Sequence, residues 1–176
     1  MPNEENLAES LMRENLGRAV GDVFETMLGR SARLVATGND GADGAAPPTA
    51  STRIPLLVVG TVGFIGEANG LVYLRLEESF AIRCTGYMLG LNESELAEAG
   101  VETVNDAVGE ITNMVVGNFK TVVTEAGYPC SLTIPSILRG SNFCVEPIGS
   151  ARRHMYHFEC EGHLIVADLL LKSDEA

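Results

Sequence analysis

The sequence predicts a mixed α/β protein of the α+β type, in which long helices pack on a mostly antiparallel sheet. The strongest helical pattern lies in residues 93–126, where apolar side chains recur every three or four residues, as one face of a helix requires. These apolar side chains are Val104, Val108, Ile111, Val115, Phe119, Val122 and Ala126. Several strand candidates follow one another across turns of two or three residues, and connections that short join antiparallel neighbours.

The other elements are predicted from the same periodicities and from glycines that end them. We expect helices at 7–28, 79–89 and 93–126, the last broken near Gly100, and strands at 32–36, 56–67, 71–76, 131–138, 154–160 and 164–171. Residues 37–52, TGNDGADGAAPPTAST, are rich in Gly, Asp, Ala and Pro and predict a loop or an insertion. The whole chain, residues 1–176, is expected to form one domain.

Composition and charge exclude several classes of function. The 176 residues include 12 Lys and Arg against 24 Asp and Glu, a formal net charge of −12. Nucleic acids and anionic membranes attract clustered cations, so neither is expected as a partner. The longest nearly apolar run, 56–66, is too short to span a bilayer, and the acidic start lacks the features of a secretory signal. We therefore expect a cytoplasmic protein. Its four cysteines form no CxxC pair and are expected to be buried thiols.

An internal similarity predicts that the chain consists of two related halves. The segment AVGDVFETMLG at 19–29 aligns without gaps to AVGEITNMVVG at 107–117, so that Gly21 corresponds to Gly109, 88 residues later. Strand candidates follow each copy. We interpret the pattern as a pseudo-duplication of one unit of a helix followed by strands.

The second copy of this helix carries a polar face. On a helical wheel Asp106, Glu110, Asn113 and Gly117 fall in one narrow arc, away from the apolar stripe. Gly109 and Gly117 are costly inside a helix, and we expect another backbone or molecule to approach them closely. By spacing alone, however, a polar pair three residues apart is most often a solvated helix face.

The same stretch resembles a known family. Residues 106–128, DAVGEITNMVVGNFKTVVTEAGY, are similar to the signature helix of the CheX branch of the CheC/CheX/FliY chemotaxis phosphatases, which carries a Glu-x-x-Asn motif. Here the motif is Glu110-Ile111-Thr112-Asn113, followed by Gly117 and Lys120. The resemblance extends to the first helix, the first hairpin, the IPSILRG segment at 134–140 and the final hairpin. The resemblance does not extend to the 37–52 loop.

The resemblance implies a phosphatase, a hydrolase of two-component signalling that removes the aspartyl phosphate of a CheY-type response regulator. Asn113 would orient the attacking water, a role that suits an amide because it donates and accepts hydrogen bonds while staying neutral. Glu110 would dock against a lysine of the regulator. The resemblance also implies a homodimer. The Mg²⁺ ion of the reaction would belong to the regulator, and no cofactor of the chain's own is expected.

The first copy lacks the amide. At the positions of Glu110 and Asn113 it has Asp22 and Glu25, and a carboxylate cannot donate a hydrogen bond and repels a phosphoryl group. We therefore predict one active site per chain, and we interpret Asp22 and Glu25 as solvated side chains. The alternative for the whole chain is a non-catalytic module that binds a response regulator or a motor-switch component, which would not need the amide of Asn113.

Six of the acidic residues lead up to the predicted site. Between Arg83 and Lys120 there is no Lys or Arg. The acidic residues of this interval are Glu93, Glu95, Glu98, Glu102, Asp106 and Glu110. Their field would favour the approach of a partner that presents a lysine, at a rate that falls with added salt.

Overall fold

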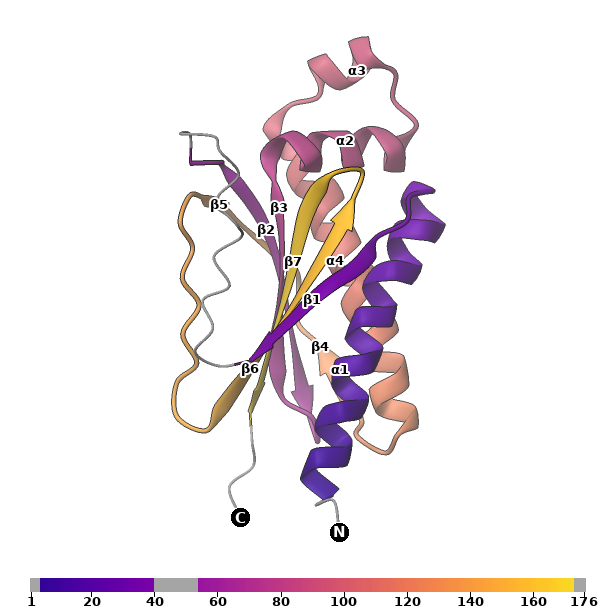
Figure 1. Ribbon diagram of the computed structural model, residues 1–176. Helices are drawn as coiled ribbons and strands as arrows, with labels where there is room; N and C mark the ends of the chain where they lie inside the picture. Colours follow the sequence, from indigo (N-terminus) through magenta and orange to yellow (C-terminus); the bar gives the residue numbers. More distant parts are fainter. Residues whose placement is uncertain (1–3, 40–53, 173–176) are drawn as a thin grey trace.

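The computed structural model describes residues 4–39 and 54–172 as one antiparallel sheet with helices on one of its faces (Figure 1). The helical elements are α1 (Glu4–Val23), the π-helical turn η1 (Phe24–Leu28), α2 (Glu78–Leu89), α3 (Glu93–Glu98) and α4 (Val101–Glu125). The strands are β1 (Arg33–Asn39), β2 (Leu57–Gly66), β3 (Gly70–Glu77), β4 (Cys130–Leu132), β5 (Ser136–Gly140), β6 (Ala151–Cys160) and β7 (His163–Lys172). This architecture confirms the predicted fold class.

Three details differ from the prediction. The first strand continues through Thr37, Gly38 and Asn39, which pair with β6, and the rest of the predicted loop, residues 40–52, lies outside the described residues. The strand predicted at 131–138 is two short strands, because Pro135 has no N–H for the ladder to β2. The end of the first helix widens into η1, which Gly29 ends with a φ of 61°.

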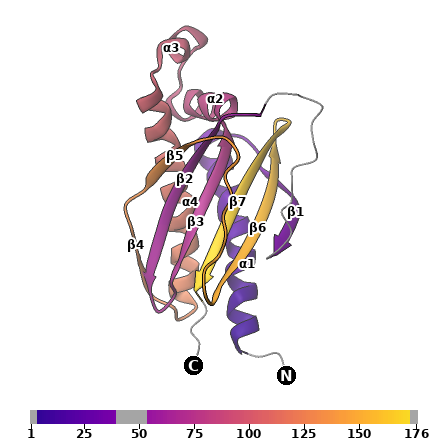
Figure 2. The same cartoon turned by 90° about the vertical axis from the view of Figure 1, so that its left-hand side faces the viewer.

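The order of the strands supports the two-unit interpretation. Along the sheet the order is β1-β6-β7-β3-β2, with β4 and β5 both paired to β2 at the far edge. If β1, β2 and β3 correspond to β5, β6 and β7, the order of corresponding strands is the same when it is followed from either edge of the sheet. The first strand of each unit pairs with the second strand of the other unit, since β1 pairs with β6 and β5 with β2. Helices α1 and α4 lie side by side over the same face (Figures 1 and 2).

Helix α4 is pressed against the sheet at one small residue. A side chain at Gly60 of β2 would place its Cβ 1.9 Å from Thr112 Oγ1, so only glycine fits there. The Thr112 hydroxyl is fully buried and donates a 2.7 Å hydrogen bond to the Val108 carbonyl, which satisfies it within the helix. One helical turn further towards each end, Val108 and Val115 are also fully buried. The core contact fixes how α4 is rotated about its axis.

The opposite face of the sheet holds a buried ion cluster. Asp168 of β7 is fully buried, and its carboxylate forms ion pairs with Arg75 of β3 and with Arg153 of β6, whose Nε lies 2.7 Å from Oδ1. Pairing from both neighbouring strands compensates the cost of burying the carboxylate. The cluster ties together the three central strands across the junction of the two units.

Three of the four cysteines follow the prediction. Cys84, Cys130 and Cys160 are buried, and burial raises the pKa of Cys84 to about 12. Cys144 is exposed, which corrects the expectation of four buried thiols, because it lies in the connection between β5 and β6 rather than in a strand. Among the described helices, none is both long and apolar enough to cross a membrane.

Candidate active site on helix α4

Helix α4 separates a buried apolar face from the polar face that carries the motif. The buried side consists of Val104, Ala107, Val108, Gly109, Ile111, Thr112, Val115, Val116, Phe119 and Val123. Asp106 and Glu110 are exposed, and Asn113 and Gly117 are half-buried. The structure thus places all four residues of the predicted arc outside the core, as the wheel predicted.

The two motif side chains have no partner within the described part of the chain. Neither the Glu110 carboxylate nor the Asn113 amide forms a side-chain hydrogen bond or an ion pair with another described residue. They project from successive turns of one helix, three residues apart. The carboxylate and the amide are therefore both available to a second molecule that approaches α4.

The flank of α4 that carries Asn113 runs along the β4–β5 edge of the sheet. Towards the start of the helix, a Cβ on Gly109 would lie 3.9 Å from the Ile137 side chain of β5. Towards its end, Lys120 is close enough to Cys130 of β4 to oppose the rise in that thiol's pKa that burial causes. Asn113 lies between these two contacts along the helix.

An arginine outside the sequence motif holds the first turns of α4. Arg139 of β5 donates from Nε to Asn105 Oδ1 at 2.7 Å and from Nη1 to Glu78 Oε1 at 2.5 Å. It thereby links β5 to α4 and α2, one turn before Glu110. One feature of the sequence indicates that Arg139 has a specific role, because it is the only charged residue in the segment 131–140.

The acidic approach predicted from the sequence is present on the surface. Helix α3 and the first turns of α4 carry all six carboxylates, and every one of them is exposed. None of the six forms an ion pair with a described cation. The negative charge that precedes the motif is therefore uncompensated by this chain's own described side chains.

The interior glycines of α4 are not explained by contacts within the described chain. A Cβ at Gly109 would make only an ordinary contact with Ile137, and one at Gly117 would meet nothing within 4 Å. The expectation of a close approach is thus not met by any described segment. At Gly117 the open space faces outward, beside the motif.

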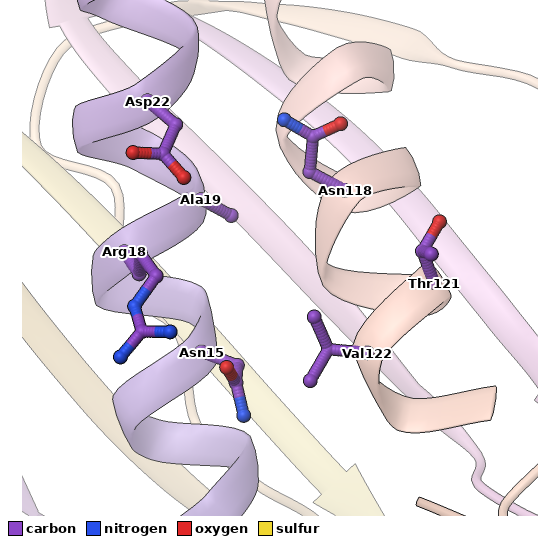
Figure 3. A pocket seen from close by; sticks show the side chains of 7 residues that line it. All are labelled: Asn15, Arg18, Ala19, Asp22, Asn118, Thr121 and Val122. Atoms are coloured by element: carbon purple, nitrogen blue, oxygen red, sulfur yellow. The ribbon is translucent and has the colours of Figure 1, made fainter. Parts of the chain in front are cut away.

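The corresponding face of α1 borders a groove between the two long helices. The groove has a volume of about 250 Å³ and is lined by Asn15, Arg18, Ala19, Asp22, Asn118, Thr121 and Val122. In Figure 3 the Asp22 carboxylate and the Asn118 amide project from its opposite walls. Glu25 is exposed and lies within η1, so the first-copy pair is not on one continuous α-helix. No group of three or more potential metal ligands occurs among the residues that the structure describes.

Comparison with known families and structures decides the relationship. The family model described as "Chemotaxis phosphatase CheX" matches residues 58–159, which is more than half of the chain. The chain belongs to the CheX family. The CheX match includes α4 with its motif and most of the sheet. Comparison with curated proteins yields no match.

Solved structures share the CheX fold over nearly the whole chain. The chemotaxis protein CheX from Desulfovibrio desulfuricans is 19% identical, with a TM-score of 0.71, covering 91% of this chain and 98% of that one. A CheC-like superfamily protein from Shewanella sp. PV-4 is also 19% identical, with a TM-score of 0.75 over 93% and 98% of the two chains. The CheX–CheY–BeF3–Mg²⁺ complex from Borrelia burgdorferi gives 18% identity, a TM-score of 0.67, and coverage of 92% and 97%.

Proposed function

We propose that this protein hydrolyses the aspartyl phosphate of a CheY-like response regulator, with Asn113 orienting the attacking water and Glu110 docking the regulator. The observation that carries the proposal is the pair of unpartnered polar side chains, one turn apart on the outer face of α4, in a chain of the CheX family. The comparison with a CheX–CheY complex supports a CheY-like partner.

The chemistry asks little of the protein beyond positioning. Hydrolysis of an acyl phosphate needs a water in line with the leaving oxygen, and the transition state gains most from orientation and electrostatic complementarity. The Asn113 amide can accept a hydrogen bond from the water while its N–H donates to a phosphoryl oxygen. Because the amide is neutral, it brings no repulsion to the phosphoryl group. The buried contact of Thr112 with Gly60 holds the helix that presents this amide.

Glu110 supplies the complementary charge on the same face. Its exposed carboxylate would pair with a lysine of the regulator, and the five acidic residues that precede it would strengthen the attraction over a longer range. A cation that docks there would place the regulator's phosphorylation site over Asn113. The acidic approach thus accelerates encounter, whereas the motif pair sets the register of the complex.

The proposal assigns the metal ion to the partner. The Borrelia complex contains Mg²⁺ and BeF3 together with CheY, and by analogy the Mg²⁺ ion needed here would be bound by the regulator, with no cofactor on this chain. We further propose that the chain acts as a homodimer in the cytoplasm, where such regulators work. Sedimentation equilibrium of the purified protein would test the dimer directly, since a monomer at micromolar concentration would contradict it.

The decisive experiment compares two asparagines on one helix. Phosphate loss from a phosphorylated CheY-like regulator is followed with wild type, Asn113→Ala and Asn118→Ala, and binding of each to the beryllofluoride-activated regulator is measured in parallel. We expect Asn113→Ala to lose turnover while it keeps binding, and Asn118→Ala, which changes the groove wall on the other flank, to keep both. Equal turnover by wild type and Asn113→Ala would refute the catalytic role. Tight binding by a wild type that does not accelerate dephosphorylation would favour the non-catalytic module.

A further inference from the structure

A large apolar side chain is exposed at the sheet edge beside α4. Ile134, in the connection between β4 and β5, is 84% exposed. An isolated exposed isoleucine is unremarkable on its own. The environment of Ile134 is what distinguishes it, because the connection is held in place and lies alongside the proposed catalytic residue.

The connection that carries Ile134 is held by the neighbouring strand. Gly63 of β2 donates its N–H to Thr133 Oγ1 at 2.9 Å, and its carbonyl accepts the Thr133 N–H at 2.9 Å. A Cβ at Gly63 would lie 3.1 Å from the Thr133 side chain, so the small residue on β2 accommodates Thr133 closely. On the other side of Ile134, the ring of Pro135 restricts the backbone. Ile134 is therefore presented by an ordered part of the chain.

Two contacts place this connection beside the part of α4 that follows Asn113. At one end Thr112 of α4 lies against Gly60 of β2, which pairs with Ile137. At the other end the ring of Phe119 packs on Phe64 of β2, which pairs with Leu132. Ile134 lies between Leu132 and Ile137 in the chain, so it is level with the stretch of α4 between Thr112 and Phe119, which begins at Asn113. Figure 2 shows this part of the chain bowing outward at the edge of the sheet.

We infer that Ile134 is a docking residue for the response regulator, a proposal that rests on the proposed function of α4. The occupant is the receiver domain itself, which would place an apolar side chain from beside its phosphorylation site against Ile134 while its lysine meets Glu110. The two contacts lie on either side of Asn113 and combine one charged and one apolar anchor. The charged anchor acts over a longer range, and the apolar anchor resists dissociation because its burial removes water from both surfaces.

A matched pair of exposed isoleucines tests the inference. Ile148 is 89% exposed and belongs to the connection between β5 and β6. Figure 1 shows this connection on the side of the sheet away from α1 and α4. We would measure the affinity of Ile134→Ser, Ile148→Ser and wild type for the beryllofluoride-activated regulator, together with steady-state dephosphorylation. The expected result is about tenfold weaker binding for Ile134→Ser and wild-type binding for Ile148→Ser, the size typical of an interface anchor. Turnover of Ile134→Ser at saturating regulator should equal that of wild type, with only KM raised.

Each contrary outcome has a defined meaning. Wild-type affinity of Ile134→Ser, or an equal loss in Ile148→Ser, would overturn the docking role. A loss of kcat without a change in KM would also overturn it, because the residue would then act on the chemistry. If Ile134→Ser weakened self-association in sedimentation experiments and bound normally as a monomer, the residue would belong to an interface between copies of this chain. Because binding is measured directly, an absence of phosphatase activity in wild type would refute the proposed function and leave the Ile134 result readable.

Discussion

The two long helices of this protein have similar sequences but present different chemistry. Helix α1 has Asp22 and Glu25 where α4 has Glu110 and Asn113. The backbone also differs at these positions: α1 ends at Val23 and widens into the π-helical turn η1, whereas α4 remains α-helical for three more turns after Asn113.

The first copy differs from the proposed site in two separate respects. Its side chains are both carboxylates, which cannot donate to a phosphoryl oxygen. Its second carboxylate also lies in a wider turn, so the spacing of three residues no longer spans one α-helical turn. The sequence alignment of the two copies detects only the difference in side chains. It does not detect the wider turn, because the residues of η1 have the apolar spacing of an ordinary helix.

Converting the second copy into the first should have the largest effect. Asn113→Glu puts a carboxylate where the amide would hold water, and we expect a loss of turnover of about 100-fold or more, in the range found for a lost transition-state donor. Single-turnover dephosphorylation is the measurement. A variant that retains wild-type turnover would show that the difference between the copies is not the amide.

Reversing the charge of the first motif residue should have the next largest effect. Glu110→Lys places a cation against the regulator's lysine, and we expect at least tenfold weaker binding, with a smaller salt dependence than wild type because an attraction has been lost. Binding titrations at two salt concentrations would measure both the affinity and its salt dependence. Glu102→Lys, two turns earlier and also exposed, is the control and should weaken binding less.

Gly117 allows stability and binding to be separated. A Cβ there meets nothing within 4 Å, so Gly117→Ala should raise the free energy of unfolding by about 0.5–1 kcal/mol through helix propensity. If a partner approaches α4 as closely as the glycine permits, the same variant should bind the regulator more weakly. Urea denaturation measures the free energy of unfolding, and a binding titration measures the affinity for the regulator. A more stable variant that binds normally would mean that the regulator does not occupy the space at Gly117.

Introducing the amide into the first copy should have the smallest effect. We expect Glu25→Asn, introduced into the Asn113→Ala background, to restore no turnover, because the new amide would lie in η1 rather than on a continuous α-helix. The same dephosphorylation assay is used. Recovery of activity would show that the side chain alone separates the two copies.

Sequence periodicity predicted most of the fold because its strong elements are amphipathic. The stripe from Val104 to Ala126 predicted α4, and the arc around Glu110 is outside the core. The break at Pro135 and the extension of β1 to Asn39 depend on pairing with strands far away in sequence, which local propensity does not encode. For the same reason Arg139 and Ile134 acquire their significance only when β5 is placed beside α4.

The exchange of first strands between the two units makes each half structurally dependent on the other. Since β1 completes the sheet of the second unit and β5 that of the first, a fragment that contains either unit alone would expose an unpaired strand edge. Each half therefore needs a strand of the other to complete its part of the sheet. Substitutions on the surface of α1 would leave this pairing intact, whereas deletion of that half would remove the strands that pair with β5 and β6.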